Sequence, residues 1–201
     1  MESFWNLLIH NIQRTAPLEF IAVGFGLLSV FFIMKENIWG YPTGLLNVGL
    51  YVYLCFKAGL FANMGINVFY FIVSIYGWYN WAHPGEQETR LRVKRLNRKE
   101  TLIAICSMMI LLFFIWRLLR DFPESSYPFF DALTTSIFII AMVLQALKCL
   151  ESWILWIAGD FIAIPLFASS GLAFTCLQYL AFLIMAISGF FSWKKSLLRN
   201  D

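Results

Sequence analysis

This sequence of 201 residues has little charge: Asp, Glu, Lys and Arg make up 13% of it, whereas hydrophobic residues make up 60% and the mean hydropathy is +0.71. A soluble domain of this length needs many more charged side chains to cover its surface. The composition therefore excludes an ordinary soluble globular protein and indicates a membrane protein.

Residue types that hold metals or haem, or that act as nucleophiles, are also scarce. The two histidines, His10 and His83, lie outside the apolar segments, and the four cysteines are too widely spaced for a metal cluster or a disulfide framework. The sequence contains no Gly-x-x-x-x-Gly-Lys-[Ser/Thr] motif for ATP, and no nucleophile lies in a plausible setting with a base. We therefore predict no catalytic residue, no metal site and no cofactor, and we expect that the protein is not an enzyme.

The sequence is rich in long apolar runs. Seven of them approach the roughly 17 to 25 residues that a transmembrane helix needs. They are residues 18–34, 38–58, 60–81, 101–119, 130–147, 152–169 and 172–193. The runs predict an all-α polytopic membrane protein with seven transmembrane helices.

Basic residues set the expected orientation of these helices. The segment between the third and fourth runs carries six of the 15 lysines and arginines, and such a bias is typical of cytoplasmic loops. Lys194, Lys195 and Arg199 follow the last run. Seven spans place both basic groups in the cytoplasm, with the amino terminus outside. This bias explains the basic loop better than a nucleic-acid or lipid patch does, and we predict no nucleic-acid partner.

The two halves of the sequence show a weak repeat. Tyr76-Gly77-Trp78-Tyr79-Asn80-Trp81 and Ser188-Gly189-Phe190-Phe191-Ser192-Trp193 both place aromatic residues after a glycine and end on tryptophan, 112 positions apart. Gly59-Leu60 and Gly171-Leu172 share this offset. Two triplets of helices separated by one helix have the same orientation, which is the arrangement of transporters with parallel repeats.

This repeat predicts three segments. They are a first three-helix bundle (1–82), a cytoplasmic basic loop with a linker helix (83–128), and a second three-helix bundle with a cytoplasmic tail (129–201). A site between the two bundles is expected near the middle of the membrane.

Asp160 is an ionisable residue inside the apolar run 152–169. Such a residue in a membrane helix is a functional-site hypothesis by default. Trp153, Trp156 and Asp160 follow one another at i, i+3 and i+7, so the three side chains fall within about 20° of one helical line. Two indoles and a carboxylate in this arrangement favour a flat cationic ligand.

Polar side chains of other runs are expected to converge on this site. They are Asn47 in the second run, Asn67 and Tyr70 on a polar stripe along the third run, and Gln178 in the seventh run. Isolated amides in membrane helices also serve as hydrogen-bonding groups between helices, and this alternative stays open for Asn47. Trp39, Trp81 and Trp193 lie at the ends of runs, where aromatic residues anchor a helix at the membrane surface.

Several motifs resemble those of the PnuC vitamin transporters. They are Trp39-Gly40-Tyr41-Pro42-Thr43-Gly44, Leu60-Phe61-Ala62-Asn63-Met64, the segment from Tyr76 to Trp81, and the segment from Glu151 to Asp160. The resemblance covers nearly the whole chain. It implies two parallel three-helix bundles joined by a linker helix (3+1+3), as in full-length SWEET transporters, and a homotrimer in the bacterial inner membrane.

The resemblance also implies a function, namely uptake of nicotinamide riboside by facilitated diffusion, with trapping by a separate intracellular kinase. It implies a pocket of Trp153, Trp156 and Asp160, with Asn67 and Asn47 nearby. Many nicotinamide riboside carriers of the family have Asn in place of Asp160, and some relatives take thiamine, which is also a cation. Thiamine uptake therefore stays open, as do two other classes, a SWEET-type sugar carrier and a non-transporting membrane receptor or scaffold.

Overall fold

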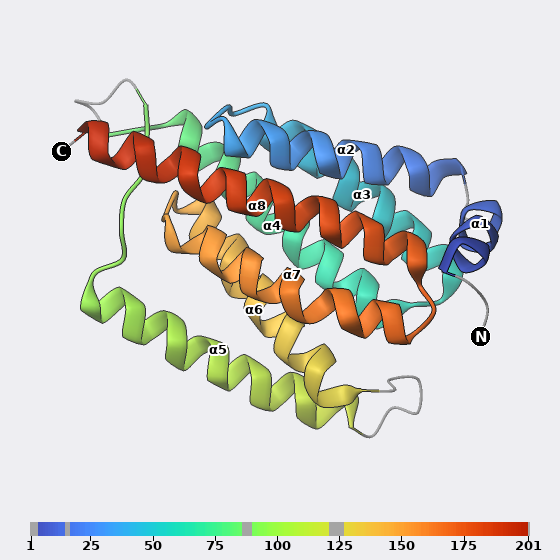
Figure 1. Cartoon of the computed structure of the whole chain (residues 1–201). Helices are drawn as coiled ribbons and strands as arrows, with labels where there is room; N and C mark the ends of the chain where they lie inside the picture. Colours follow the sequence, from blue (N-terminus) through green and yellow to red (C-terminus); the bar gives the residue numbers. More distant parts are fainter. Residues whose placement is uncertain (1–3, 15–16, 86–89, 121–126, 201) are drawn as a thin grey trace.

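A computed structural model describes residues 4–14, 17–85, 90–120 and 127–200 as a bundle of helices (Figure 1). The helices are α1 Phe4–Arg14, α2 Pro17–Met34, α3 Gly40–Ala58, α4 Phe61–Ala82, α5 Arg98–Leu119, α6 Pro128–Ala146, α7 Glu151–Ser169 and α8 Ala173–Asn200. No β-strand occurs within the described ranges. Residues 86–89 and 121–126 of the predicted linker segment lie outside the described residues.

The all-α class predicted from the sequence is confirmed. The seven long helices coincide closely with the seven apolar runs, although α8 continues to Asn200 and the short helix α1 was not predicted. Five of them, α2, α5, α6, α7 and α8, are long and apolar enough to cross a membrane by length and composition. Helices α3 and α4 are of similar length but include polar residues such as Asn47 and Asn67, which lower their hydropathy.

Local backbone geometry recurs at the offset of 112 residues that the sequence motifs show. Gly59 and Gly171 both have a φ of +73°, and Glu36 and Lys148 have φ values of +55° and +56°. The turns are closed by matching bonds, Leu60 N to Cys55 O at 2.9 Å and Leu172 N to Phe167 O at 3.0 Å. Left-handed backbone is uncommon outside glycine, so its recurrence at Glu36 and Lys148 indicates that the two connections are built alike.

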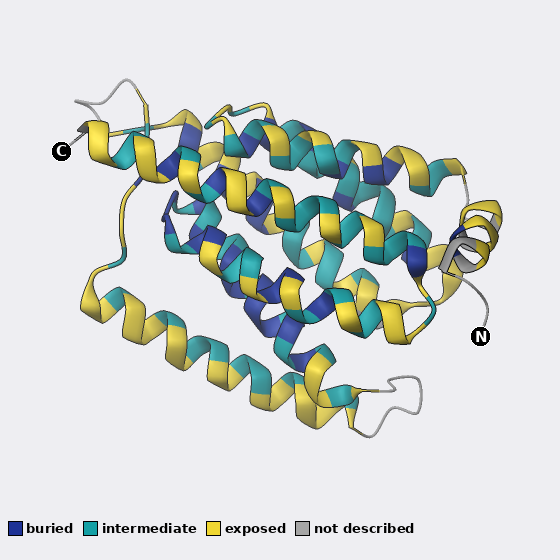
Figure 2. Cartoon of the chain, in the orientation of Figure 1, coloured by how far each residue is buried: buried dark blue, intermediate teal, exposed yellow. Residues whose placement is uncertain are grey.

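Helix α5 lies at the outer edge of the bundle (Figure 1), where it packs against α6. It has no buried residue, and Figure 2 shows it in the colours of exposed and half-buried side chains along its length. Asn97 and Glu100 begin it with a capping box: the Asn97 side chain accepts from Glu100 N at 2.9 Å, and Glu100 Oε2 accepts from Asn97 N at 2.8 Å. An apolar helix with this exposure suits a lipid environment.

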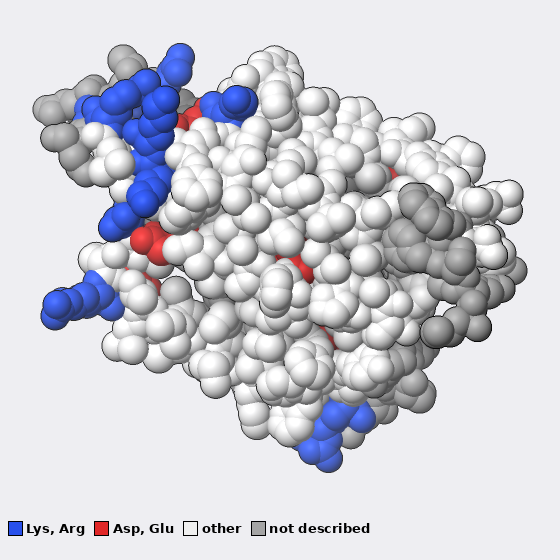
Figure 3. All heavy atoms as spheres, in the orientation of Figure 1, with Lys and Arg blue, Asp and Glu red and all other residues white. Residues whose placement is uncertain are grey.

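The charged residues gather at one end of the bundle. Figure 3 shows a broad face with few charges across its middle, and Lys and Arg side chains concentrated near the carboxy terminus. The connections α2–α3, α4–α5 and α6–α7 lie at this end (Figure 1), which we call the basic end.

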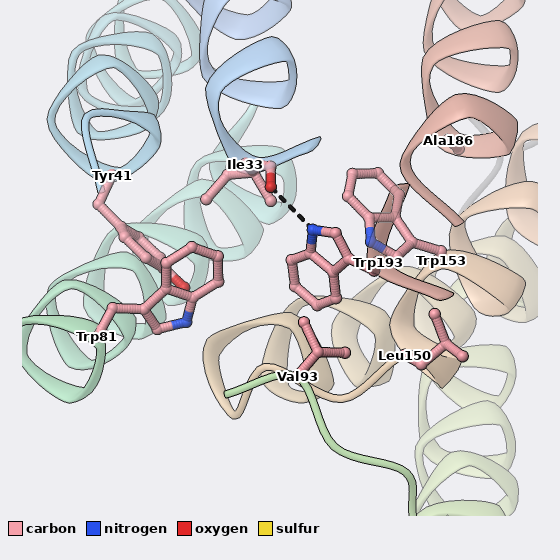
Figure 4. Close-up of a cluster of buried hydrophobic side chains, with 8 residues drawn as sticks. All are labelled: Ile33, Tyr41, Trp81, Val93, Leu150, Trp153, Ala186 and Trp193. Atoms are coloured by element: carbon pink, nitrogen blue, oxygen red, sulfur yellow. Dashed lines mark hydrogen bonds between the residues drawn. The ribbon is translucent and has the colours of Figure 1, made fainter. Parts of the chain in front are cut away.

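The interior of the basic end is filled by what we call the aromatic cluster (Figure 4). Its buried members are Ile33, Tyr41, Trp81, Val93, Leu150, Trp153, Ala186 and Trp193. Trp39 is 62% exposed, as expected of a residue at the membrane surface, but Trp81 is 7% and Trp193 0% exposed. The interpretation of these two as surface anchors is therefore wrong, because the ends of α4 and α8 turn their indoles toward each other.

Candidate functional site

Asp160 lies in the interior of the bundle on α7, with 2% of its surface exposed. The residue before it is Gly159, where a Cβ would overlap the ring of Phe138 on α6. The missing side chain allows α6 to approach α7 directly beside the carboxyl group. A carboxyl group in such a place is costly to keep charged, so its presence indicates a functional role.

The polar neighbours of Asp160 are tyrosines from other helices. Its carboxyl group interacts electrostatically with Tyr179 of α8, and Tyr179 interacts in the same way with Tyr51 of α3. Tyr70 of α4 also interacts with Tyr179, and the side chain of Tyr51 forms a hydrogen bond with Gln178 of α8. The structure therefore connects three of the expected site residues, Asp160, Tyr70 and Gln178, into one polar network.

An aromatic wall adjoins this network. Trp156 stacks on Phe138 with ring centroids 5.4 Å apart and planes at 27°, and Phe138 contacts Tyr179 at 6.0 Å. Phe167 contacts the other side of Tyr179 at 4.9 Å. The Trp156 indole is fixed by a hydrogen bond from its Nε1 to Gln145 Oε1 at 2.8 Å. Aromatic faces beside a carboxyl group form a setting that attracts a flat cation.

Trp153 has different surroundings, although it shares a helical line with Trp156 and Asp160. It is 1% exposed, belongs to the aromatic cluster, and meets Trp193 edge to face with centroids 5.4 Å apart. The trio predicted from the sequence thus reaches from the polar network at Asp160 to the basic end at Trp153.

Asn47 links two helices of the first half. Its Nδ2 donates to Ala22 O of α2 at 2.7 Å, and its amide packs against Gly26. This contact of Asn47 with Gly26 recurs 112 positions later as that of Gly159 with Phe138, with the large and small residues exchanged. The bond to Ala22 is of the interhelical kind that the sequence left open as an alternative for Asn47.

Asn67 is half-buried on α4, and its Nδ2 donates to Asn63 O one turn earlier, at 2.9 Å. Among the contacts described for this part of the chain, none joins Asn67 or Asn47 to the Asp160 network. Their side-chain oxygens are the atoms through which either amide would accept a bond from a ligand.

Sequence reasoning did not select Tyr51, Tyr179, Phe138 or Gln145 for the site. Tyrosine and phenylalanine are ordinary in membrane helices, so three of these residues gave no signal. Gln145 is an amide within the apolar run 130–147 and was a signal that could have been used. In the described ranges, no group of three or more His, Cys, Asp or Glu side chains is placed to hold a metal ion.

The hydrogen bond of Trp156 can be tested by substitution. We expect Trp156→Phe to lower stability by about 1 kcal/mol, because Gln145 Oε1 loses its buried donor while the stacking on Phe138 is largely kept. The measurement is the apparent melting temperature of the purified protein. Trp39→Phe is the matched control, since Trp39 is 62% exposed, and it should leave the melting temperature unchanged. Equal effects of the two substitutions would contradict the assignment.

A bundle of long apolar helices around a buried carboxyl group, with tyrosines from both halves of the chain, defines the class of a multi-pass membrane transporter. The sequence profile described as nicotinamide mononucleotide transporter matches residues 16–195. The chain belongs to this family. Its members are transporters, so the protein is not an enzyme.

Individual relatives bear out the PnuC resemblance found in the sequence. The chain is 29% identical over 196 residues to the nicotinamide riboside transporter PnuC of Escherichia coli K12, covering 85% of this chain and 82% of that protein. It is 25% identical over 171 residues to the riboflavin/roseoflavin transporter RibM of Streptomyces davaonensis, covering 84% and 80%. The crystal structure of a vitamin B3 transporter PnuC superimposes with a TM-score of 0.75 at 25% identity, covering 98% and 89% of the two chains.

Proposed function

We propose that this protein takes up nicotinamide riboside across the bacterial inner membrane by facilitated diffusion, and that a separate intracellular kinase traps the substrate. The observation that carries this proposal is the buried Asp160 beside the stacked rings of Trp156 and Phe138. Nicotinamide riboside has a flat pyridinium ring with a fixed positive charge, which suits a carboxylate and aromatic faces. The PnuC proteins of Escherichia coli and Neisseria mucosa, both named nicotinamide riboside transporters, support the choice.

The proposed pocket consists of the residues selected from the sequence together with two tyrosines of the network. They are Trp153, Trp156, Asp160, Asn67, Asn47, Tyr70 and Gln178, with Tyr51 and Tyr179 added. Asp160 balances the charge of the ring, and the indole of Trp156 lies against its face. The amides and phenolic hydroxyls hold the ribose hydroxyls, because these groups can both donate and accept hydrogen bonds.

The proposed arrangement is two parallel three-helix bundles, 1–82 and 129–201, joined through the segment 83–128. The turns that recur at an offset of 112 residues and the position of α5 at the edge of the bundle support it. We propose further that the basic end faces the cytoplasm, with the amino terminus outside, following the distribution of positive charge. In the proposed homotrimer, exposed apolar side chains of the bundle would meet neighbouring copies.

Two other substrates and one other class deserve a direct comparison. Thiamine is a cation like nicotinamide riboside, so charge does not distinguish the two. Riboflavin, which the name of RibM mentions, has an uncharged ring system and would leave the buried Asp160 without a partner of opposite charge. A non-transporting receptor or scaffold would bind a ligand or a protein without moving a solute into liposomes.

Titration of the purified protein, followed by tryptophan fluorescence, distinguishes these substrates. We expect nicotinamide riboside to change the fluorescence at the lowest concentration and riboflavin to bind most weakly, because only the two cations neutralise Asp160. Uptake of radiolabelled nicotinamide riboside into liposomes should continue after proton and sodium gradients are removed. Tighter binding of thiamine would identify a thiamine transporter, and binding without uptake would favour a receptor.

A further inference from the structure

Two pairs of residues that lie 112 positions apart in the sequence contact each other at the basic end. Lys148 Nζ lies 2.9 Å from Glu36 Oε2, and the ring centroids of Trp81 and Trp193 are 5.7 Å apart. Within each pair, both members occupy the same place in the repeated pattern. The two contacts therefore lie where the first half of the chain meets the second.

Lys148 is buried in this junction, with 3% of its surface exposed. Besides Glu36, its Nζ donates to Leu91 O at 2.6 Å and lies 4.6 Å from the centroid of the Trp81 ring. A buried ammonium group requires such partners, since it has given up its hydration. Lys148 therefore connects the α6–α7 turn with the α2–α3 turn, the end of α4 and the α4–α5 segment.

The surroundings of the two tryptophans are also repeated (Figure 4). Tyr41 meets Trp81 edge to face at 5.2 Å and 84°, and Trp153 meets Trp193 at 5.4 Å and 87°. Tyr41 and Trp153 are themselves 112 positions apart. Two further bonds cross between the halves here, from Trp193 Nε1 to Ile33 O at 3.0 Å and from Asn80 Nδ2 to Ala146 O at 2.9 Å.

The aromatic cluster leaves several donors without partners. Within the described part of the chain, Tyr41 Oη, Trp81 Nε1 and Trp153 Nε1 are buried and have no hydrogen-bond partner. Such groups regain hydrogen bonds as soon as water or a ligand reaches them. The packed arrangement thus carries a cost that separation of the two halves would remove, and the Glu36–Lys148 pair opposes this separation.

We propose that the Glu36–Lys148 pair and the aromatic cluster form a gate, which closes the path between the Asp160 network and the basic end and opens when the two halves separate. The gate rests on the proposed transport function, because a carrier must open its central site to one side at a time. Trp153 belongs to both the gate and the proposed pocket, so opening changes the surroundings of the site.

Cys149 provides a native reporter of this opening, because it follows Lys148 directly and is 0% exposed. Burial raises the pKa of its thiol to about 11, so the closed gate should make its modification slow. Replacement of Cys55, Cys106 and Cys176 by serine leaves Cys149 as the single thiol of the full-length protein. The rate of its reaction with a small maleimide then measures how often the gate opens.

We expect Glu36→Gln and Trp193→Phe each to increase the labelling rate about tenfold, because each removes one interaction across the junction. Glu100→Gln is the matched control: it removes the charge of the exposed Lys94–Glu100 pair at the same end, and glutamine still completes the helix cap. This control should label at the rate of the parent protein. Gel filtration and the apparent melting temperature establish that each variant is folded.

Labelling of both folded variants at the parental rate would overturn the gate. The measurement needs no substrate, so its result is independent of the proposed function. If nicotinamide riboside binds normally while labelling is unchanged, the gate fails and the proposed function stands. If labelling accelerates in both variants but no vitamin binds, the gate stands and the proposed substrate fails.

Discussion

Asp160→Asn is expected to weaken the binding of nicotinamide riboside about 10- to 100-fold, which corresponds to about 1.4 to 2.8 kcal/mol. The reason is electrostatic: Asp160 is 2% exposed, and a charge in such a setting interacts more strongly with a cationic ring than it would in water. Asparagine has the same shape and keeps hydrogen bonding, so the change isolates the charge. Tryptophan fluorescence titration of the purified variant and parent measures the effect.

The free variant is expected to be at least as stable as the parent, because a buried carboxyl group is replaced by a neutral amide. Asp131→Asn, the same substitution in the first turn of α6, is the control and should leave affinity unchanged. Asp160→Leu should abolish measurable binding of either cation. Unaltered affinity in Asp160→Asn, with the protein still folded, would remove Asp160 from the pocket and reopen the receptor or scaffold reading.

Gly189→Ala is expected to destabilise the protein by about 1 to 3 kcal/mol, although alanine is the better helix former. A Cβ at residue 189 of α8 would lie 2.6 Å from Cζ2 of Trp153, which belongs to a ring only 1% exposed and held against Trp193. The indole must shift to admit the methyl group, and the aromatic cluster then loses its packing. The apparent melting temperature of the purified protein should fall by several degrees.

Gly65→Ala is the matched control for this prediction. Gly65 is also inside a long helix, but a Cβ there has no heavy atom within 4 Å. The gain in helix propensity should therefore stand alone, and the melting temperature should rise slightly or stay unchanged. A similar rise in Gly189→Ala would show that the aromatic cluster is loosely packed, against the contacts described above.

The helices could be predicted from the sequence because their signals are local. An apolar run of sufficient length forms a helix in a membrane whatever lies beside it, since every backbone group must bond within the segment. The predicted runs consequently coincide with α2 to α8. Helix α1 was missed because Phe4–Arg14 is short and mixes apolar with polar residues.

The site could be predicted only in part. Asp160 is conspicuous in an apolar run, and Gln178 and Tyr70 share its network. Tyr51 and Tyr179 could not be selected, because a tyrosine in a membrane helix becomes part of a site only through the neighbours that other helices bring to it. For Trp81 and Trp193 the position at a run's end predicted exposure, whereas their inward faces buried them.

The sequence by itself determined the membrane class, the helices, the offset of 112 residues and the family, since composition, run length and motifs are properties of the chain in one dimension. Only the tertiary structure decided which faces meet: that Glu36 pairs with Lys148, that Trp81 meets Trp193, and that Tyr179 adjoins Asp160. The physical reason is that these contacts join segments about a hundred or more residues apart or on separate helices. Such contacts are set by the packing of whole helices, which no local pattern contains.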